Sequence, residues 1–411
     1  MLKRRVILLS ASLLFSVFAA EFILGKFYPQ KTYSALYKNS ISCFAKSAVT
    51  VFTLKPNCTI PFTDFDTNET IKTQTNNLGY RGSDFPIVKP PGEKRILLEG
   101  DSFILGFGVK DQDVISSQLE NQLEKINKTY SLAGAKVINA GYAGGFGPDG
   151  YFLHLKTAGV ILKPDLVAFS VFVYNDLSDI GNDEWIGLGR WGEPEKVVSK
   201  TTTVDDGGRL IPLSIPLVYR IPLLRDSQVA VFTANTVGKI VPFIRHVYDK
   251  IRFAVRKPVT PTGEARDSNF LGAYDSFCIF GDSCHRQTMH LFSDLLTTIK
   301  ASDSLINNLY KDTRPHFLVM LIPADFQLYP ESLKKYNDSG IPYTAASQAD
   351  PNPQRRIKEM LTKEKIPYLD LLPEFRKSTE RLYFKNDGHW NRNGHQLAAD
   401  LLAKWIEENY R

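Results

Sequence analysis

The feature that most constrains the fold is a series of short apolar segments that alternate with helical patterns. The clearest segment, residues 165–174, is almost continuously apolar, which is typical of a strand buried on both faces of a sheet. A helical pattern over 148–162 precedes it, and Pro148 suits a first helical position. Strands that alternate with helices predict a parallel sheet with right-handed crossovers.

Other parts of the chain continue this alternation. Further strands are expected at 95–98, 137–138, 317–322 and 368–371, and further helices near 115–126, 353–365 and 394–409. The alternation is interrupted over residues 181–309. The sequence therefore predicts an α/β domain in two parts, 91–180 and 310–411, with a large insertion (181–309) between the third and fourth strands, which forms a cap or substrate wall.

The N-terminal segment 1–28 is expected to lie outside this domain. Three cations at positions 3–5 precede an apolar run from Val6 to Gly25, which is long enough as a helix to cross a bilayer core of about 30 Å. The basic flank favours the cytoplasmic side. The small residues Ala19 and Ala20 fit a cleavage site only loosely, which favours an uncleaved signal anchor over a signal peptide. We expect the remaining chain on the periplasmic or extracellular face.

Residues 29–90 contain Thr, Asn and Pro and end in a Pro-Pro-Gly turn, which predicts an extension or linker. The four cysteines form two local pairs, Cys43 with Cys58 and Cys278 with Cys284. An oxidising compartment would close such pairs as disulfides. The alternative, a metal site built from the second pair and neighbouring histidines, lacks a Cys-x-x-Cys spacing.

The charge balance excludes one class of partner. The net charge of +6 is spread along the chain without a clustered basic stripe, so nucleic-acid binding is not expected. Within the insertion, residues 239–257 carry six cations and one acid among apolar residues. This pattern fits a basic helix on an anionic membrane or, as we favour, a cap helix on the α/β domain. Aromatic residues of the insertion could line a sugar or lipid site or fill a core: Trp185, Trp191, Tyr219 and Phe253.

A candidate nucleophile follows the first expected strand. Gly100-Asp101-Ser102 places a hydroxyl at the carboxyl edge of the sheet, where open α/β sheets bind ligands. The same triplet recurs at 281–283, but without a preceding strand, and is interpreted as a turn. A serine needs a base oriented by a carboxylate. His389, in a polar loop after the last strand with Asp387 two residues earlier, fits this role; the rival His395 opens a helix and is explained as a capping or surface residue.

Acyl transfer also needs donors for the oxyanion of its tetrahedral intermediate. Gly144, in a glycine-rich turn after the second strand, allows close approach of a backbone N–H. Asn175, after the third strand, offers a side-chain amide. Each residue alone is also explained by an ordinary turn. Four such features after successive strands are harder to explain in that way.

These blocks in this order resemble the SGNH (GDSL-type) hydrolase superfamily, and the run 95–109 resembles its membrane-anchored bacterial members. The resemblance implies a three-layer α/β/α sandwich of flavodoxin type that hydrolyses or transfers ester-linked acyl groups. It also implies the site: Ser102 as nucleophile, His389 as base, Asp387 as its orienting acid, and an oxyanion hole from Ser102, Gly144 and Asn175. Many members place the acid three residues before the histidine, where this chain has Asn386.

The resemblance implies a serine esterase that forms an acyl-serine intermediate without metal or organic cofactor. Its expected substrate is an acylated small molecule, lipid or polysaccharide of the cell envelope. One alternative is an O-acyltransferase for envelope polysaccharide that uses the same triad. Another is a non-catalytic carbohydrate-binding protein with this fold, because a fold does not by itself determine an activity.

Overall fold

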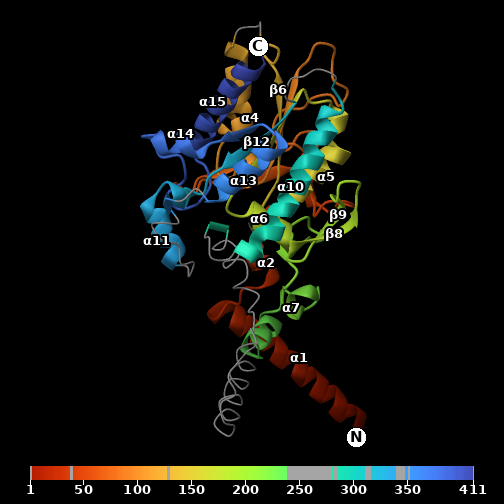
Figure 1. The fold of residues 1–411 in the computed structure, drawn as a ribbon. Coiled ribbons are helices and arrows are strands. Elements are labelled where there is room, and N and C mark those ends of the chain that lie inside the picture. The colour runs from red at the N-terminus through yellow and green to blue at the C-terminus, as the bar shows by residue number, and fades with distance from the viewer. Residues whose placement is uncertain are drawn as a thin grey trace, which may run out of the picture. The chain divides into compact units, whose positions relative to one another are not determined.

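The computed structural model describes residues 2–37, 40–126, 130–237, 279–280, 285–310, 316–338, 348–349 and 352–410. The chain forms two compact units (Figure 1). The larger unit consists of Ile41–Leu210 and Arg266–Arg411, and the smaller one of Met1–Ser40 and Ile211–Ala265.

The larger unit is built on a five-stranded sheet. Its strands are β5 (Arg95–Gly100), β6 (Lys136–Gly141), β7 (Leu166–Phe172), β12 (Phe317–Ile322) and β13 (Tyr368–Asp370). They lie in the order β13-β12-β7-β5-β6, and every neighbouring pair is parallel. Every residue of β5, β7 and β12 is buried, as expected for strands covered on both faces. This is the predicted flavodoxin-type order.

Helices cover both faces of the sheet. On one face α4 (Ile115–Lys125) packs against α15 (Arg392–Asn409), and on the other α5 (Pro148–Thr157) packs against α10 (His285–Asn307), which also contacts α13 (Asn352–Glu364). The predicted three-layer sandwich is therefore confirmed. Helix α10 starts within the expected insertion, but Leu295 and Ile299 on it are fully buried in the main core. The end of the insertion is thus the crossover helix that precedes the fourth strand.

The remaining elements of the larger unit are α3 (Ser102–Leu105), η1 (Asp111–Asp113), η2 (Gly159–Leu162), α6 (Asp176–Asn182), β8 (Asp183–Leu188), β9 (Pro194–Ser199), β10 (Thr202–Val204), η3 (Asp325–Gln327), α11 (Pro330–Asp338) and α14 (Leu372–Lys377). Strand β11 (Leu210–Pro212) runs into the smaller unit, to which α7 (Leu217–Arg220) belongs. Strands β8 and β9 form an antiparallel hairpin, where Trp185 donates from Nε1 to Asp149 over 2.7 Å. The basic stretch 239–257, Phe253 and the pair Cys278 and Cys284 lie outside the described residues.

Residues 41–90 differ from the expectation of a linker, because they pack into the main core. They form β1 (Phe44–Ala45) with β2 (Thr53–Leu54), and a hairpin of β3 (Thr59–Thr63) with β4 (Thr70–Gln74). Both hairpin strands alternate exposed and buried residues, which gives them one apolar face to bury. The expected disulfide between Cys43 and Cys58 is present. Arg81 pairs with Asn139 of β6, so this segment also covers one edge of the sheet.

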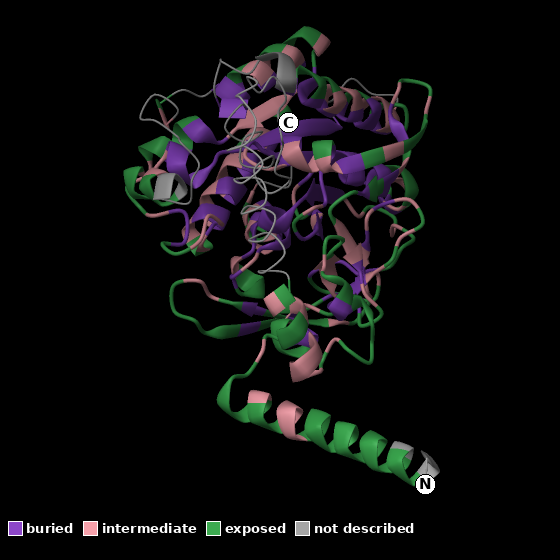
Figure 2. Ribbon diagram, turned by 90° about the horizontal axis from the view of Figure 1, so that it is seen from below, coloured by how far each residue is buried: buried purple, intermediate pink, exposed green. Residues whose placement is uncertain are grey.

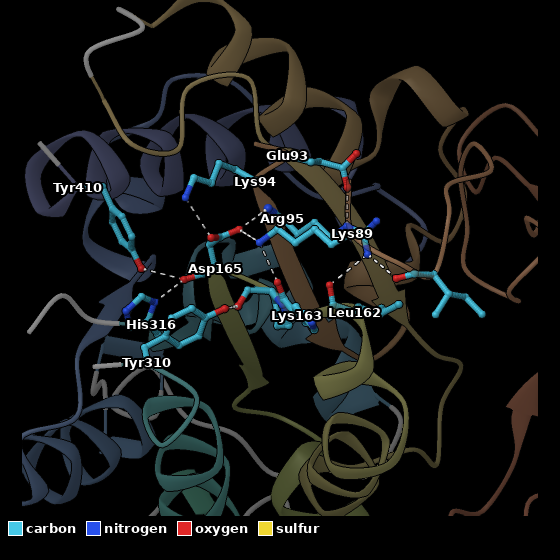
Figure 3. Close-up of polar contacts among 12 residues, drawn as sticks. Lys89, Glu93, Lys94, Arg95, Leu162, Lys163, Asp165, Tyr310, His316 and Tyr410 are labelled. Carbon is cyan, nitrogen blue, oxygen red and sulfur yellow. Dashed lines mark hydrogen bonds and ion pairs between the residues drawn. The ribbon is translucent and has the colours of Figure 1, made fainter. Parts of the chain in front are cut away.

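A polar cluster joins the amino ends of β5, β7 and β12 (Figure 3). The Asp165 carboxylate accepts hydrogen bonds from the Arg95 backbone N–H over 2.8 Å and from the Lys89 and Lys94 ammonium groups. The Arg95 guanidinium is fully buried and donates to three backbone carbonyls and to Glu93. Since ligands of open α/β sheets bind at the opposite edge, this cluster has a structural role.

The smaller unit contains α1 (Leu2–Phe27) and α2 (Tyr33–Leu36). Residues Ile7–Phe27 of α1 have a mean hydropathy of 2.2 and are long and apolar enough to cross a membrane. Figure 2 shows α1 as almost entirely exposed. The rest of this unit has a small core of Tyr33, Val218, Tyr219 and Val231. Tyr219, named above as a possible ligand contact, is therefore a core residue.

Candidate active site

The candidate nucleophile lies on a tight turn between β5 and α3. Asp101 caps α3, with its Oδ1 accepting from the Phe103 N–H over 2.9 Å. A Cβ at Gly100 would lie 2.3 Å from Cγ1 of Ile104, so the turn requires glycine at this position. These constraints hold Ser102 at the carboxyl end of β5.

The structure brings the three expected catalytic side chains together. The Ser102 Oγ lies 2.7 Å from Nε2 of His389. The other ring nitrogen, Nδ1, is hydrogen-bonded to Oδ1 of Asp387, which also accepts from the His389 backbone N–H over 2.9 Å. With Nδ1 protonated toward the carboxylate, Nε2 is free to accept the serine proton.

The charge of Asp387 suits this role. Burial opposes its ionisation, but the hydrogen bond from the His389 ring, the ring's charge and the His389 N–H outweigh burial and lower the pKa of Asp387. The carboxylate therefore stays ionised at neutral pH. In contrast, burial raises the pKa of Asp101 to about 6, although the Phe103 N–H and His389 oppose this rise. Asp101 caps α3, whereas Asp387 is the carboxylate bonded to the imidazole.

Asn175 lies at the start of α6, and Gly144 lies in the turn between β6 and α5. The Asn175 Nδ2 donates to Oδ2 of Asp179 over 3.0 Å. Burial raises the pKa of Asp179, and the negative charge of the nearby Asp101 raises it further, to about 8. A Cβ built at Gly144 would meet no atom within 4 Å. The role of both residues as oxyanion donors stays a prediction.

His395, the rival base, is buried away from Ser102. Its Nδ1 accepts from the Ile115 N–H, the first residue of α4, over 3.3 Å. Burial, together with the nearby Arg81 and His389, lowers the pKa of His395 to about 3, so the ring is neutral. The expectation of a surface residue or a cap of its own helix is therefore wrong: His395 is buried inside α15, which Asn391 caps, and its ring bonds to the start of α4. The second Gly-Asp-Ser triplet, 281–283, lies outside the described residues.

Three phenylalanines that the sequence analysis did not identify surround the His389 ring. Phe107 and Phe65 stack on it with ring centroids 5.5 and 5.9 Å away, and Phe103 lies 5.1 Å away in a tilted orientation. Phe103 and Phe107 flank the nucleophile turn, whereas Phe65 comes from the tip of the β3–β4 hairpin. These contacts restrict the ring to the orientation in which Nε2 faces Ser102.

The same hairpin tip holds the backbone of the histidine loop. Asp66 Oδ1 accepts from the N–H groups of Lys385 and Asn386 over 2.8 and 3.1 Å. The Asn386 side chain donates to the Phe65 carbonyl over 3.3 Å. Asn386, at the position where the family often has its acid, thus ties the loop to the hairpin, and the acid is supplied by the next residue.

Arg81 holds the other half of the site in a similar way. Its guanidinium is 3% exposed and donates to the carbonyls of Leu105, Gly106 and Val109 over 2.5–2.7 Å. Its Nε also donates to Asp111 over 2.9 Å. No motif indicates this role, which depends on contacts between distant segments. The β3–β4 hairpin could have been predicted from the sequence, because two segments of alternating apolar and polar residues flank the polar turn 64–69.

Residues 304–411 match a family model described as "SGNH hydrolase-like domain, acetyltransferase AlgX". No match was found among curated protein sequences.

Solved structures that match this chain include a lipase/acylhydrolase from Enterococcus faecalis, at 14% identity and a TM-score of 0.34, covering 77% of this chain and 96% of that one. A catalytic mutant of an acetylxylan esterase from Geobacillus stearothermophilus is 11% identical at a TM-score of 0.35, with coverage of 78% and 96%. A GDSL-like lipase from Bacteroides thetaiotaomicron is 12% identical at 0.34, with coverage of 78% and 91%.

Proposed function

This chain contains an SGNH hydrolase-like domain, and from that premise we propose that it is a serine enzyme that hydrolyses an ester-linked acyl group through an acyl-serine intermediate. One observation carries the proposal: the Ser102 Oγ lies 2.7 Å from Nε2 of His389, whose Nδ1 is bonded to Asp387. A hydroxyl, a base and an orienting carboxylate in this sequence form the set that acyl transfer requires.

The proposed reaction has two half-steps. The Ser102 Oγ attacks the ester carbonyl carbon while its proton passes to Nε2 of His389, and Asp387 stabilises the resulting imidazolium. The tetrahedral intermediate then collapses, and the leaving alkoxide takes this proton. In the second half-step water attacks the acyl-serine, gives a proton to His389, and releases the carboxylic acid as Ser102 recovers the proton.

The oxyanion would be stabilised by the backbone N–H groups of Ser102 and Gly144 and by the Asn175 amide. The Asn175 Nδ2 carries two hydrogens, and Asp179 accepts one of them. This contact orients the amide. The open space beside Gly144 would admit the carbonyl group.

The second candidate is an O-acyltransferase, in which a sugar hydroxyl replaces water as the acceptor. The match of residues 304–411 to an acetyltransferase-type family model favours it. Both reactions use the same acyl-serine and differ in the acceptor that reaches it. We propose an envelope carbohydrate or lipid as substrate. We also propose that α1 anchors the chain in the membrane with the catalytic unit outside the cytoplasm.

The test uses the full-length chain purified in detergent and exposed to a fluorophosphonate probe and a short-chain nitrophenyl ester. Wild type and Ser283→Ala should label and turn over, whereas Ser102→Ala should do neither. Ser283→Ala is the matched control because it alters the second Gly-Asp-Ser triplet. If a folded wild type neither labels nor turns over, the non-catalytic binding protein replaces the enzyme as the best explanation.

An acetylated sugar donor offered with and without a hydroxyl acceptor would then separate the two candidates. A hydrolase releases acetate at the same rate in both cases. A transferase forms the acylated acceptor and releases acetate slowly when the acceptor is absent.

A further inference from the structure

Residues 211–237, which we call the anchor lobe, fold against the C-terminal end of α1. They share the small core of this unit, in which Tyr33 packs with Val218, Tyr219 and Val231. Tyr219 donates from its hydroxyl to the Lys31 carbonyl over 2.8 Å. The anchor lobe is thus part of the unit that carries the apolar helix.

Hydrogen bonds to Glu21 join the anchor lobe to α1 itself. Glu21, the one charged residue between Val6 and Gly25, accepts from the N–H groups of Gln228 and Val229 over 2.8 and 3.3 Å and from the Ser227 hydroxyl. These are the first N–H groups of the helical segment 228–237, which otherwise have no partner within that helix. A carboxylate in an apolar helix is costly in lipid unless such donors satisfy it.

Further hydrogen bonds fix the position of the anchor lobe along the axis of α1. Gln30 donates from its backbone to the Gln228 side chain over 2.6 Å, and Tyr33 donates to the Arg225 carbonyl over 2.9 Å. Glu21 lies about 9 Å from the end of α1 at Phe27, because a helix rises 1.5 Å per residue. The start of the segment 228–237 therefore lies level with the last turns of α1.

The surface of the anchor lobe is unusually apolar for a part of the chain outside a core. Leu223 is 90% and Leu217 69% exposed, and Leu224 and Phe232 are also exposed. Phe27 and Tyr28 at the end of α1 are exposed as well. Cations accompany them: Lys26, Lys31 and Arg220 are exposed, and Arg225 is partly exposed. Exposed leucines with aromatic residues and cations at the end of an apolar helix are typical of a membrane interface.

We propose that the anchor lobe is a membrane-interface element whose partner is the lipid bilayer, with Leu217 and Leu223 entering the boundary between headgroups and acyl chains. The inference rests on the proposal that α1 is a retained anchor. The main support for the inference is that Glu21 fixes the anchor lobe to the final turns of a membrane-length helix. The cations would contact lipid phosphates.

The experiment places a photoreactive azidophenylalanine at single positions of the full chain, reconstituted in vesicles of phosphatidylethanolamine and phosphatidylglycerol. Position 223 tests the anchor lobe, position 15 in α1 is the positive control, and position 88 is the exposed apolar control in the larger unit. Mass spectrometry measures the fraction captured as lipid adduct. We expect capture at 223 to approach that at 15 and to exceed that at 88 at least about 5-fold.

The outcomes separate the two proposals. If position 15 captures lipid but position 223 captures no more than position 88, the anchor-lobe inference alone is overturned. If neither position 15 nor position 223 captures lipid, the proposal that α1 is an anchor is overturned as well. Glu21→Ala should reduce capture at 223 and leave capture at 15 unchanged, whereas Glu21→Gln, which keeps an acceptor oxygen, should restore it. Equal capture at 223 in all three backgrounds contradicts the role of Glu21. Fluorophosphonate labelling at Ser102 reports separately that the catalytic unit is folded and active.

Discussion

The hydroxyl oxygen of Ser102 lies 2.7 Å from Nε2 of His389, although 287 positions separate the two residues in the chain. The serine follows β5, next to one edge of the sheet, and the histidine loop comes after β13 at the other edge and leads into α15. The parallel order of the strands brings both loops to the same edge. The contact is therefore a product of the topology.

Under the proposed function Ser102 and His389 act as one unit, so the effects of their substitutions should not be additive. Ser102→Ala or His389→Ala alone should lower kcat on the order of 10⁴–10⁶-fold, and the double variant little further. Single-turnover and steady-state rates on a nitrophenyl ester measure this. Independent losses that multiply in the double variant would contradict the assigned pair.

Asp387→Asn should lower kcat on the order of 10⁴-fold with little change in KM, because an amide cannot stabilise the imidazolium and favours the wrong ring tautomer. The lowered pKa of Asp387 means that wild type keeps this anion well into acid pH. Lys385→Ala, which removes an exposed side chain from the same loop and keeps the backbone N–H bonded to Asp66, is the control and should retain most of the activity. Equal losses in both variants would show that the loop, not the charge, matters.

Asp66→Ala removes the acceptor for the Lys385 and Asn386 N–H groups and should loosen the histidine loop. A misplaced base lowers kcat by about 10–100-fold while KM stays nearly constant. Glu69→Ala, on the same hairpin tip but paired with Lys110, is the control and should leave kcat unchanged. A thermal midpoint that falls in step with kcat would mean that Asp66 only stabilises the fold.

Arg81→Ala should destabilise the larger unit by about 3–5 kcal/mol, because it leaves buried carbonyls without their charged donor. Urea unfolding followed by tryptophan fluorescence measures this. Arg209→Ala, which removes a partly exposed pair with Asp205, should cost about 1 kcal/mol or less. Similar losses in the two variants would be inconsistent with the role of Arg81 beneath the nucleophile turn.

Asp179 should make stability depend on pH. Burial and the charges of Asp101 and Asp149 raise its folded pKa to about 8, above the ordinary 3.8. Between about pH 4 and 8 the folded chain therefore binds more protons than the unfolded chain, and the free energy of unfolding falls as pH rises. Asp179→Asn should raise the thermal midpoint at pH 8–9 and have less effect at pH 5. The exposed control Asp206→Asn should change neither value.

The sequence alone predicted the main structure of the larger unit. Apolar segments with strand lengths, separated by helical patterns, indicate a parallel sheet because both faces of such strands must be buried. The convergence of Ser102, Asp387 and His389 could be predicted as well, since the loops that carry them lie at the carboxyl edge of a parallel sheet. Asn175 and Gly144 were identified by the same rule, but their donor roles depend on a bound substrate.

The tertiary structure decided which distant segments contact one another, because no sequence pattern links these segments. Phe65, Asp66 and Arg81 belong to a segment interpreted as a linker, and their roles arise only when the hairpin tip meets the histidine loop and the guanidinium meets the carbonyls after α3. In the same way, no pattern in the apolar run predicts a partner for Glu21, and packing places the N–H groups of Gln228 and Val229 beside it. Periodicity reports which face of an element is buried, whereas hydrogen-bond partners distant in sequence depend on how the elements pack.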